Sequence, residues 1–343
     1  MTRQITMSQA IAEATVLAMQ KDKSIFVIGE GVKDHKGIFG TTLEVNQKFP
    51  ERVFESPLSE DAMTGICAGL ALAGGRPILV HQRIEFMMLT MNQLVNNISK
   101  WRFLFGGKAG SLPIVIRAIV GRGFGQSAQH SQSLQALVSH IPGLVVVMPA
   151  TARSAKGLFL SSINSNDPVI FIEHRFCHSE TEYVPEDYFE ITLGQAKVLQ
   201  TGDDVTVVSS SYMLHEILKV LPVFKEKGVD VELIDLQTLN PLDFETIIES
   251  VKKTGRLVVA DLSWYSCGIV PTIVAYVAEH AFSYLKAPIK TITLPNTPTP
   301  CSWPLEENYY PNSQNVADKI SEVLGMPVVE GTALASKTFN GPF

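Results

Sequence analysis

The sequence predicts an α/β protein made of two doubly wound domains. Short apolar runs of strand length alternate with longer segments of helical periodicity. This alternation stops over residues 176–203, where a proline, acidic residues and a Thr-Gly-Asp turn signal interrupt it, and then resumes. Strands that alternate with helices are typical of a parallel sheet covered on both faces. The length of 343 residues also suits two domains rather than one.

The first series begins with a helix over residues 6–20, for which Thr6 is a suitable N-cap. The buried strands expected after it are residues 24–28, 77–80, 113–120, 144–148 and 169–172. The helices expected between them are residues 59–73, 86–105, 131–140 and 152–163. Together these elements predict an N-terminal domain over residues 1–185.

The second series predicts a smaller α/β domain over residues 200–327. Its strands are expected over residues 205–209, 231–235, 257–260 and 289–294. Its helices are expected over residues 213–227, 243–254 and 269–284 and near 316–324. Residues 328–343 lack periodicity, so we assign them to a tail.

Composition excludes several classes of function. The net charge of -6, without any run rich in Lys and Arg, argues against a nucleic-acid partner. No segment approaches the roughly 18 apolar residues of a membrane span, so we expect no membrane association. The four cysteines lie far apart, with no C-x-x-C pair and no histidine at metal-ligand spacing. We therefore expect reduced thiols, a cytoplasmic location and no metal site on this chain.

Loops after strands are where ligands bind in doubly wound sheets. One such loop leads into the helix at residue 59, where Ser59 is a possible cap and Glu60 and Asp61 occupy the first turn. Acidic side chains at this position commonly do no more than complement the helix dipole. Local sequence alone favours that explanation for Glu60.

Two further loops carry polar side chains. The glycine-rich segment 121–131, which includes Gln129 and His130, has the spacing G-x-G-x-G, lacks a following lysine and is a weak nucleotide motif; a surface loop is the alternative. Directly after the strand at 77–80 come His81, Gln82 and Arg83. They suit an anionic or hydroxylated substrate, and equally a solvated strand end. Phe86, just beyond, is either a core residue or a flat face for a heteroaromatic ring.

Several short stretches occur in a characteristic order and spacing along nearly the whole chain. They are Ile28-Gly29-Glu30, Ser56-Pro57-Leu58-Ser59-Glu60, Gly74-Gly75-Arg76-Pro77, Gln129-His130-Ser131-Gln132, Pro142-Gly143-Leu144, Leu257-Val258-Val259, Asn296-Thr297-Pro298 and Pro304-Leu305-Glu306. In this order they resemble the beta subunits of the thiamine-diphosphate-dependent dehydrogenase component of 2-oxo acid dehydrogenase complexes, within the transketolase-like superfamily. The resemblance implies a pyrimidine-binding transketolase-like domain followed by a transketolase C-terminal-like domain.

The resemblance also implies roles for individual residues. Glu60 matches the glutamate that bonds to a pyrimidine ring nitrogen of thiamine diphosphate, and Phe86 matches the ring that stacks on the pyrimidine; Glu30 joins them as a cofactor-binding residue. His130 matches a second catalytic residue, which orients or protonates a substrate carbonyl oxygen. The substrate-binding residues expected are His81, Gln82, Arg83 and Gln129.

An absent motif predicts a partner. Enzymes of this kind hold the diphosphate through a divalent metal on a Gly-Asp-Gly segment, and this chain contains none. The resemblance therefore implies an alpha subunit that supplies the diphosphate site and Mg²⁺, in an α2β2 assembly. A lipoyl acyltransferase is a further expected partner, and the C-terminal domain would serve mainly in assembly.

Departures from the family pattern leave the reaction open. The polar residues at 81–83 replace an apolar run, and Asn296 replaces the usual aspartate. The first hypothesis is decarboxylation of a 2-oxo acid with transfer of the acyl group to a lipoyl carrier. The second is a split transketolase-like or acyloin-forming enzyme that transfers a carbon unit to an aldehyde or sugar. The third is a non-catalytic assembly subunit.

Overall fold

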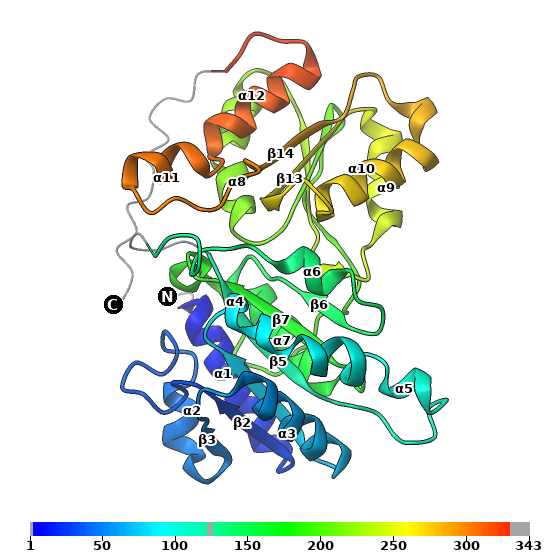
Figure 1. The fold of residues 1–343 in the computed structure, drawn as a ribbon. Helices are drawn as coiled ribbons and strands as arrows, with labels where there is room; N and C mark the ends of the chain where they lie inside the picture. The colour runs from blue at the N-terminus through cyan, green and yellow to red at the C-terminus, as the bar shows by residue number, and fades with distance from the viewer. Residues whose placement is uncertain (1–2, 122–125, 330–343) are drawn as a thin grey trace. The chain divides into compact units, whose positions relative to one another are not determined.

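The computed structural model describes residues 3–121 and 126–329, which divide into two compact units (Figure 1). The N-terminal unit comprises residues 3–121 and 137–193. The C-terminal unit comprises residues 126–136 and 194–329. The segment 126–136 thus groups with the C-terminal unit, although in sequence it interrupts the first series of elements. The α/β fold with two parallel sheets is confirmed.

The N-terminal unit opens with a well-capped helix. Thr6 accepts a hydrogen bond from the backbone of Gln9, and the Gln9 side chain accepts one from the backbone of Thr6, so the cap predicted from sequence is present. The strands are β1 (Gln4–Thr6), β2 (Ile25–Gly29), β3 (Val53–Glu55), β4 (Arg76–His81), β5 (Val115–Val120), β6 (Val145–Val147), β7 (Val169–His174) and β8 (Thr181–Tyr183). The helices are α1 (Met7–Lys21), α2 (Leu43–Lys48), α3 (Glu60–Leu72), α4 (Ile84–Met87), a π-helix (Asn92–Ile98), α5 (Trp101–Leu104), α6 (Gln135–Ser139), α7 (Ala152–Asn164) and short 3-10 turns at Pro50–Arg52, Met88–Thr90 and Cys177–Ser179.

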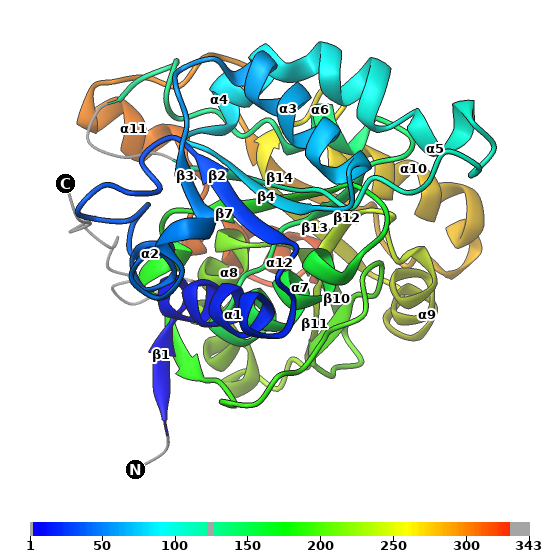
Figure 2. The ribbon, with the colours of Figure 1, turned by 90° about the horizontal axis from the view of Figure 1, so that it is seen from below.

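Parallel strands of the N-terminal unit run in the order β3-β2-β4-β5-β7-β6. In Figure 2, α1, α2 and α7 lie on one face of this sheet and α3 and α4 lie on the other. From β2 the chain crosses to β3 on one side, and from β3 it crosses to β4 on the other side of β2. The sheet therefore has a topological switch point beside β2, where doubly wound sheets bind ligands beyond the carboxyl ends of their strands.

A second sheet forms the centre of the C-terminal unit. Its strands are β9 (Lys197–Gln200), β10 (Val205–Ser209), β11 (Val231–Asp235), β13 (Leu257–Trp264) and β14 (Lys290–Leu294). The short strand β12 (Thr238–Asn240) is not part of this sheet. The helices are α8 (Tyr212–Glu226), α9 (Phe244–Thr254), α10 (Ile269–His280), a 3-10 turn (Phe282–Tyr284), α11 (Trp303–Tyr309) and α12 (Ser313–Leu324). The order is β14-β13-β10-β11-β9, parallel except for the edge strand β9. Helices α8 and α12 pack on one face, and α9 and α10 pack on the other (Figure 1).

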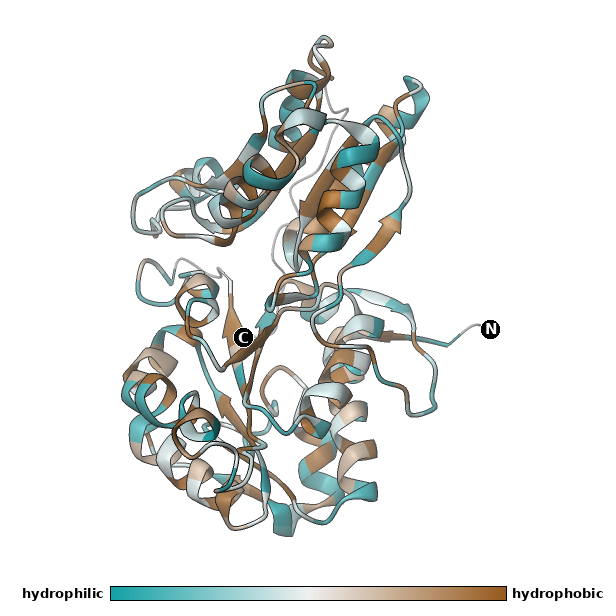
Figure 3. Cartoon of the chain, turned by 90° about the vertical axis from the view of Figure 1, so that its right-hand side faces the viewer, coloured by the Kyte–Doolittle hydropathy of each residue, from teal (hydrophilic) through white to brown (hydrophobic). Residues whose placement is uncertain are grey.

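The cores are the two sheets. Strands β5, β7, β10 and β11 are buried along their whole length. Figure 3 shows that strands inside each unit are largely coloured as hydrophobic. Strands buried on both faces read as continuous apolar runs, which explains why they were predicted from sequence. In residues 3–121 and 126–329, none of the helices combines the length and the apolar character that a membrane span needs.

Several elements differ from those predicted. The single helix expected over residues 86–105 is broken into α4, a 3-10 turn, the π-helix and α5. The helix expected over residues 131–140 is shorter in the structure and is confined to α6. Strand β3 and helix α11 were not predicted. Only one of the three residues of β3 is buried, so it leaves no apolar run to detect.

Candidate functional site

Three carboxylates gather where the N-terminal sheet switches direction. Glu30 follows β2, Glu55 is the last residue of β3, and Glu60 is the first residue of α3. Glu30 and Glu60 are half-buried, whereas Glu55 is exposed. Since the carboxyl ends of parallel strands meet at one edge of a sheet, residues 25 to 30 positions apart in sequence converge there.

Glu55 has a structural task in this group. Its Oε1 accepts a hydrogen bond from the backbone N–H of Gly31 at 2.5 Å, and its Oε2 accepts one from the N–H of Lys33 at 2.9 Å. The backbone N–H of Ser56 donates to the carbonyl oxygen of Gly29 at 2.9 Å. The loop that carries Glu30 is therefore tied to the end of β3, and Glu55 holds it in place.

The protonation of Glu30 is perturbed by its surroundings. Burial raises the pKa of Glu30 to about 6, with further contributions from the negative charges of Glu60 and Glu55. Desolvation and like charges both penalise ionisation. A carboxyl group with this pKa exchanges a proton readily near neutral pH, which is the property that acid–base chemistry requires.

The end of β4 forms the next part of this edge. His81 is 2% exposed, and its Nε2 lies 3.4 Å from the hydroxyl of Thr64 on α3, which itself donates to the carbonyl oxygen of Glu60 at 2.7 Å. Burial lowers the pKa of His81 to about 4, so its imidazole is neutral at pH 7. Gln82 is half-buried beside Gly31. His81 is thus buried against Thr64 of α3, next to the turn that carries Glu60, and does not face solvent.

Arg83 and Phe86 occupy the start of α4. Arg83 is 7% exposed, and its Nη2 donates to the carbonyl oxygen of Gly121 at 2.5 Å. Its guanidinium therefore contacts the protein where β5 leads into the glycine-rich loop. Phe86 is half-buried. The structure thus brings Glu30, Glu60, His81, Gln82, Arg83 and Phe86 to one edge of the N-terminal unit.

A buried charge cluster beneath this edge was not predicted from sequence. Arg117 of β5 donates through Nε to Glu173 Oε1 at 2.5 Å, and through Nη2 to Glu173 Oε2 and to Thr41. His178 Nε2 lies 3.0 Å from the same Oε2. Burial alone would raise the pKa of Glu173, but Arg117 and the hydrogen bonds outweigh it and lower that pKa to about 2. The sequence signal that could have revealed this cluster is a single charged residue within each of two otherwise largely apolar strands, Arg117 in β5 and Glu173 in β7.

The other predicted residues, Gln129 and His130, belong to the C-terminal unit. Gln129 is exposed and His130 is half-buried. The Gln135 amide donates to both carboxylate oxygens of the buried Asp261, at 3.2 and 3.1 Å. The Tyr310 hydroxyl donates to the carbonyl oxygen of Ser131 at 3.3 Å. Residues 122–125 of the predicted loop lie outside the described residues.

The residues at the carboxyl edge of the sheet in the N-terminal unit suit the pyrimidine half of thiamine diphosphate. An aminopyrimidine nitrogen requires a carboxyl group with which it shares a proton, and Glu30 and Glu60 lie together at the switch point, one of them with a pKa of about 6. Among residues 3–121 and 126–329, no group of three or more His, Cys, Asp or Glu side chains is placed to hold a metal ion.

Comparison with protein families assigns both halves of the chain. Residues 3–177 match the pyrimidine-binding domain of transketolase, and residues 194–316 match the transketolase C-terminal domain. A beta subunit of an acetoin:2,6-dichlorophenolindophenol oxidoreductase from Cupriavidus necator is 41% identical, covering 92% of this chain and 96% of the relative. The protein of the same name from Bacillus subtilis is 39% identical, over 96% of this chain and 100% of the relative.

Relatives named as pyruvate dehydrogenase subunits are nearly as similar to this chain. The pyruvate dehydrogenase E1 component subunit beta of Rickettsia felis is 38% identical over 93% of this chain and 98% of its own length. Among solved structures, a chain of a split-gene transketolase in an inactive beta4 tetramer matches with a TM-score of 0.75. It covers 94% of this chain and 99% of that chain at 22% identity, which supports the fold alone. The resemblance found in the sequence is confirmed.

Proposed function

This chain belongs to the transketolase-like family of E1-type beta subunits, and from that premise we propose that it is the beta subunit of a heteromeric thiamine-diphosphate enzyme. Its reaction is the decarboxylation of a 2-oxo acid, with transfer of the acyl group to a lipoyl carrier. The observation that carries the proposal is the pair Glu30 and Glu60 at the switch point of a sheet that matches the pyrimidine-binding domain.

Each predicted site residue has a defined task in the proposal. When bound, thiamine diphosphate supplies the thiazolium carbon that attacks the substrate carbonyl. Glu60 holds a proton at a pyrimidine ring nitrogen, and Glu30 exchanges protons with this site. Phe86 offers its ring to the pyrimidine, and the neutral His81 supports the turn that carries Glu60. His130 orients or protonates the substrate carbonyl, while Gln82, Arg83 and Gln129 bind substrate.

The beta-subunit relatives imply an alpha subunit as partner. We propose that this subunit brings the Gly-Asp-Gly motif with Mg²⁺, that the assembly is α2β2, and that it works in the cytoplasm with a lipoyl acyltransferase. For the chain itself, we propose a pyrimidine-binding domain over residues 1–185, a C-terminal domain over 200–327 and a tail over 328–343. A non-catalytic assembly role would leave the paired carboxylates at the switch point without a purpose.

Two neighbouring acids in α3 provide the sharpest test. Glu60 and Asp61 both lie in the first turn of the helix, so both complement the helix dipole equally. In a complex with its alpha-type chain, Glu60→Gln should lower kcat by about 100-fold or more, because acid–base catalysis contributes about that much. Asp61→Asn should leave kcat within about twofold, as expected for a residue that only complements the helix dipole. Equal effects of the two substitutions, with the assembly intact, would refute the role of Glu60.

A second candidate is cleavage or formation of an acyloin. Relatives that are 41% and 39% identical bear the name of an acetoin oxidoreductase, and their similarity slightly exceeds that of the pyruvate-type relatives. Product analysis separates the two candidates. Acylation of a lipoyl domain from a 2-oxo acid supports the first, whereas turnover of a hydroxy ketone without use of a 2-oxo acid supports the second.

A further inference from the structure

Two buried arginines meet at the carboxyl edge of the sheet in the N-terminal unit. Arg83 follows β4 and is 7% exposed, and Arg175 follows β7 and is 6% exposed. Strand β5 lies between β4 and β7, and both arginines contact its end. Nη2 of Arg83 donates to the carbonyl oxygen of Gly121 at 2.5 Å, and the backbone N–H of Arg175 donates to that of Val120 at 3.0 Å. Both side chains therefore start from the edge at which such sheets bind ligands.

Gly121 makes this close arrangement possible. Its φ is +105°, in the region that favours glycine, and a Cβ added there would lie 2.8 Å from Nε2 of His174. Because no side chain separates the ends of β5 and β7, the carbonyl oxygen of Gly121 can accept the hydrogen bond from Arg83. This contact fixes the plane of the guanidinium group. A guanidinium group has five N–H donors in a planar fork, more than a single backbone contact uses.

The guanidinium group of Arg175 lies at the same edge. Its Cζ is 5.1 Å from the centre of the Phe39 ring, within range of a cation–π contact, and Phe39 belongs to the segment that follows Glu30 after β2. Burial, and after it the positive charge of Arg83, lowers the pKa of Arg175 to about 10. The two positive charges thus repel each other at a place where water screens them little.

An anion would relieve this repulsion. Glu85 supplies one negative charge, since its Oε2 lies 3.6 Å from Nε of Arg83. Two guanidinium groups and one carboxylate still carry a formal charge of +1 together. The planar fork of a guanidinium group matches the two oxygens of a carboxylate, and charge-assisted hydrogen bonds of this kind are the strong ones. The trio of Arg83, Arg175 and Glu85 therefore favours a further carboxylate from a ligand.

We propose that Arg83 and Arg175 bind a second carboxylate of the substrate, remote from the reacting carbonyl group, so that the enzyme prefers 2-oxo dicarboxylic acids. The inference rests on the proposed function, names its substrate class and adds Arg175 to the substrate-binding residues. The carboxylate that leaves as carbon dioxide suits this pair poorly, because guanidinium groups would stabilise its charge in the ground state and oppose decarboxylation. A carboxylate at the far end keeps its charge throughout, so its binding positions the carbonyl group.

Paired substrates isolate the effect of the second charge. The complex with the alpha-type chain is assayed with 2-oxopentanedioate and with its 5-amide, which has nearly the same shape and no second charge. In the wild type, kcat/KM for the acid should exceed kcat/KM for the amide about tenfold or more, the effect of a charge-assisted hydrogen bond. Arg175→Gln should remove most of this preference. Arg175→Lys should retain part of it, because the charge remains and the planar fork is lost.

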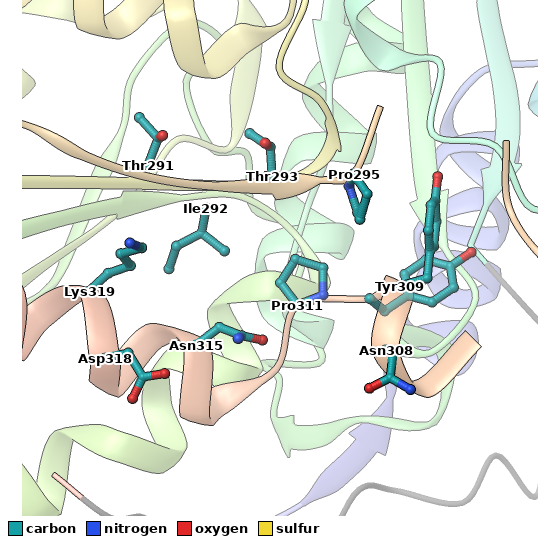
Figure 4. A pocket seen from close by; sticks show the side chains of 11 residues that line it. Thr291, Ile292, Thr293, Pro295, Asn308, Tyr309, Pro311, Asn315, Asp318 and Lys319 are labelled. Atoms are coloured by element: carbon teal, nitrogen blue, oxygen red, sulfur yellow. The ribbon is translucent and has the colours of Figure 1, made fainter. Parts of the chain in front are cut away.

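A cation elsewhere in the chain provides the matched control. Lys319 of α12 lines a hollow of about 450 Å³ in the C-terminal unit together with Asn308 and Asp318 (Figure 4). Its Nζ is paired with Oε2 of Glu322 at 2.8 Å, at the surface. Lys319→Gln removes one positive charge, as Arg175→Gln does. It should leave the ratio of the two kcat/KM values within about twofold, because an exposed ion pair is screened by water.

Calorimetric titration of the same complex measures binding without turnover. Pentanedioate, which lacks the 2-oxo group, should bind about tenfold or more tightly than pentanoate, which has a single carboxylate. Arg175→Gln should abolish this difference. Inorganic phosphate is the third probe, because guanidinium groups bind phosphate as well as carboxylate. Tighter binding of phosphate than of pentanedioate would refute the assignment to a carboxylate.

Two further results would overturn the proposal: an acid-to-amide ratio near one in the wild type, or a preference for the acid that survives both Arg175→Gln and Arg83→Gln. Failure of the proposed function gives a different pattern. A complex that decarboxylates no 2-oxo acid, yet binds pentanedioate through Arg175, retains the anion site and loses the reaction. An active complex that ignores the second charge retains the reaction and loses the site.

Discussion

Replacing Glu173 by glutamine should destabilise the N-terminal unit. In the folded protein the carboxylate accepts two hydrogen bonds from Arg117 and lies 3.0 Å from His178 Nε2, and its side chain is fully buried. Its pKa falls from 4.5 to about 2. One pH unit corresponds to about 1.4 kcal/mol, so the ionised form contributes on the order of 3 kcal/mol to folding at pH 7. Glu173→Gln also leaves the buried guanidinium of Arg117 without a counter-charge, a loss of similar size.

The contribution of the Glu173 carboxylate to stability should decrease as the pH is lowered. Because the pKa of Glu173 is lower in the folded state, its contribution is complete above the unfolded value near 4.5 and is lost as pH falls toward about 2. The difference in free energy of unfolding between wild type and Glu173→Gln should therefore shrink between pH 5 and pH 3. Urea unfolding measures this difference in the N-terminal unit when it is monitored through the hydrogen exchange of peptides from β5 and β7.

The matched control is Glu322. Hydrogen-bonded ion pairs with Lys290 of β14 and Lys319 of α12 lower the pKa of Glu322 to about 2 as well, but these contacts lie at the surface. Exposed pairs are screened by water and salt, so Glu322→Gln should leave stability unchanged within error. The reasoning fails if both variants behave alike, or if the deficit of Glu173→Gln stays constant from pH 7 to pH 3.

Two further substitutions test the switch point. Burial and like charges raise the pKa of Glu30 to about 6, so its stabilising contribution is complete below about 4.5 and lost as pH rises through 6. Because Glu30 is only half-buried and solvent screens its charge, Glu30→Gln should stabilise the isolated chain at pH 8 by about 1 kcal/mol at most, with no gain at pH 4 in urea titrations. A gain at pH 4 and none at pH 8 would contradict this. A Cβ on Gly29 would lie 2.5 Å from the carbonyl oxygen of Val80, so Gly29→Ala should destabilise by about 2 kcal/mol and weaken thiamine diphosphate binding in the complex. Gly69→Ala, with open space around the added methyl, is the control for calorimetric melting; equal melting temperatures would disprove the close contact.

Local pattern was sufficient for many elements. Helix α1 with its Thr6 cap and the buried strands β5 and β7 follow from capping and apolar runs. Helix α3 begins at Glu60, close to the predicted start, but the prediction that Ser59 caps it was wrong, because the Ser59 side chain makes no capping hydrogen bond. The family could be recognised because short stretches such as Ser56–Glu60 and Gln129–Gln132 carry order and spacing as well as identity. The broken helix between residues 84 and 104 could not be predicted, because a π-helix depends on how tertiary packing accommodates one extra residue per turn.

The sequence by itself determined the alternation of strands and helices, the family, and the presence of an acid at the start of α3. Only the tertiary structure decided which acids meet: the strand order β3-β2-β4 brings Glu30, Glu55 and Glu60 together, and burial there perturbs the pKa of Glu30. It also decided that the segment carrying His130 is held through Gln135 and Asp261, which are 126 positions apart. The physical reason is that periodicity encodes which face of an element is buried, whereas strand neighbours and desolvation depend on residues far away in the chain.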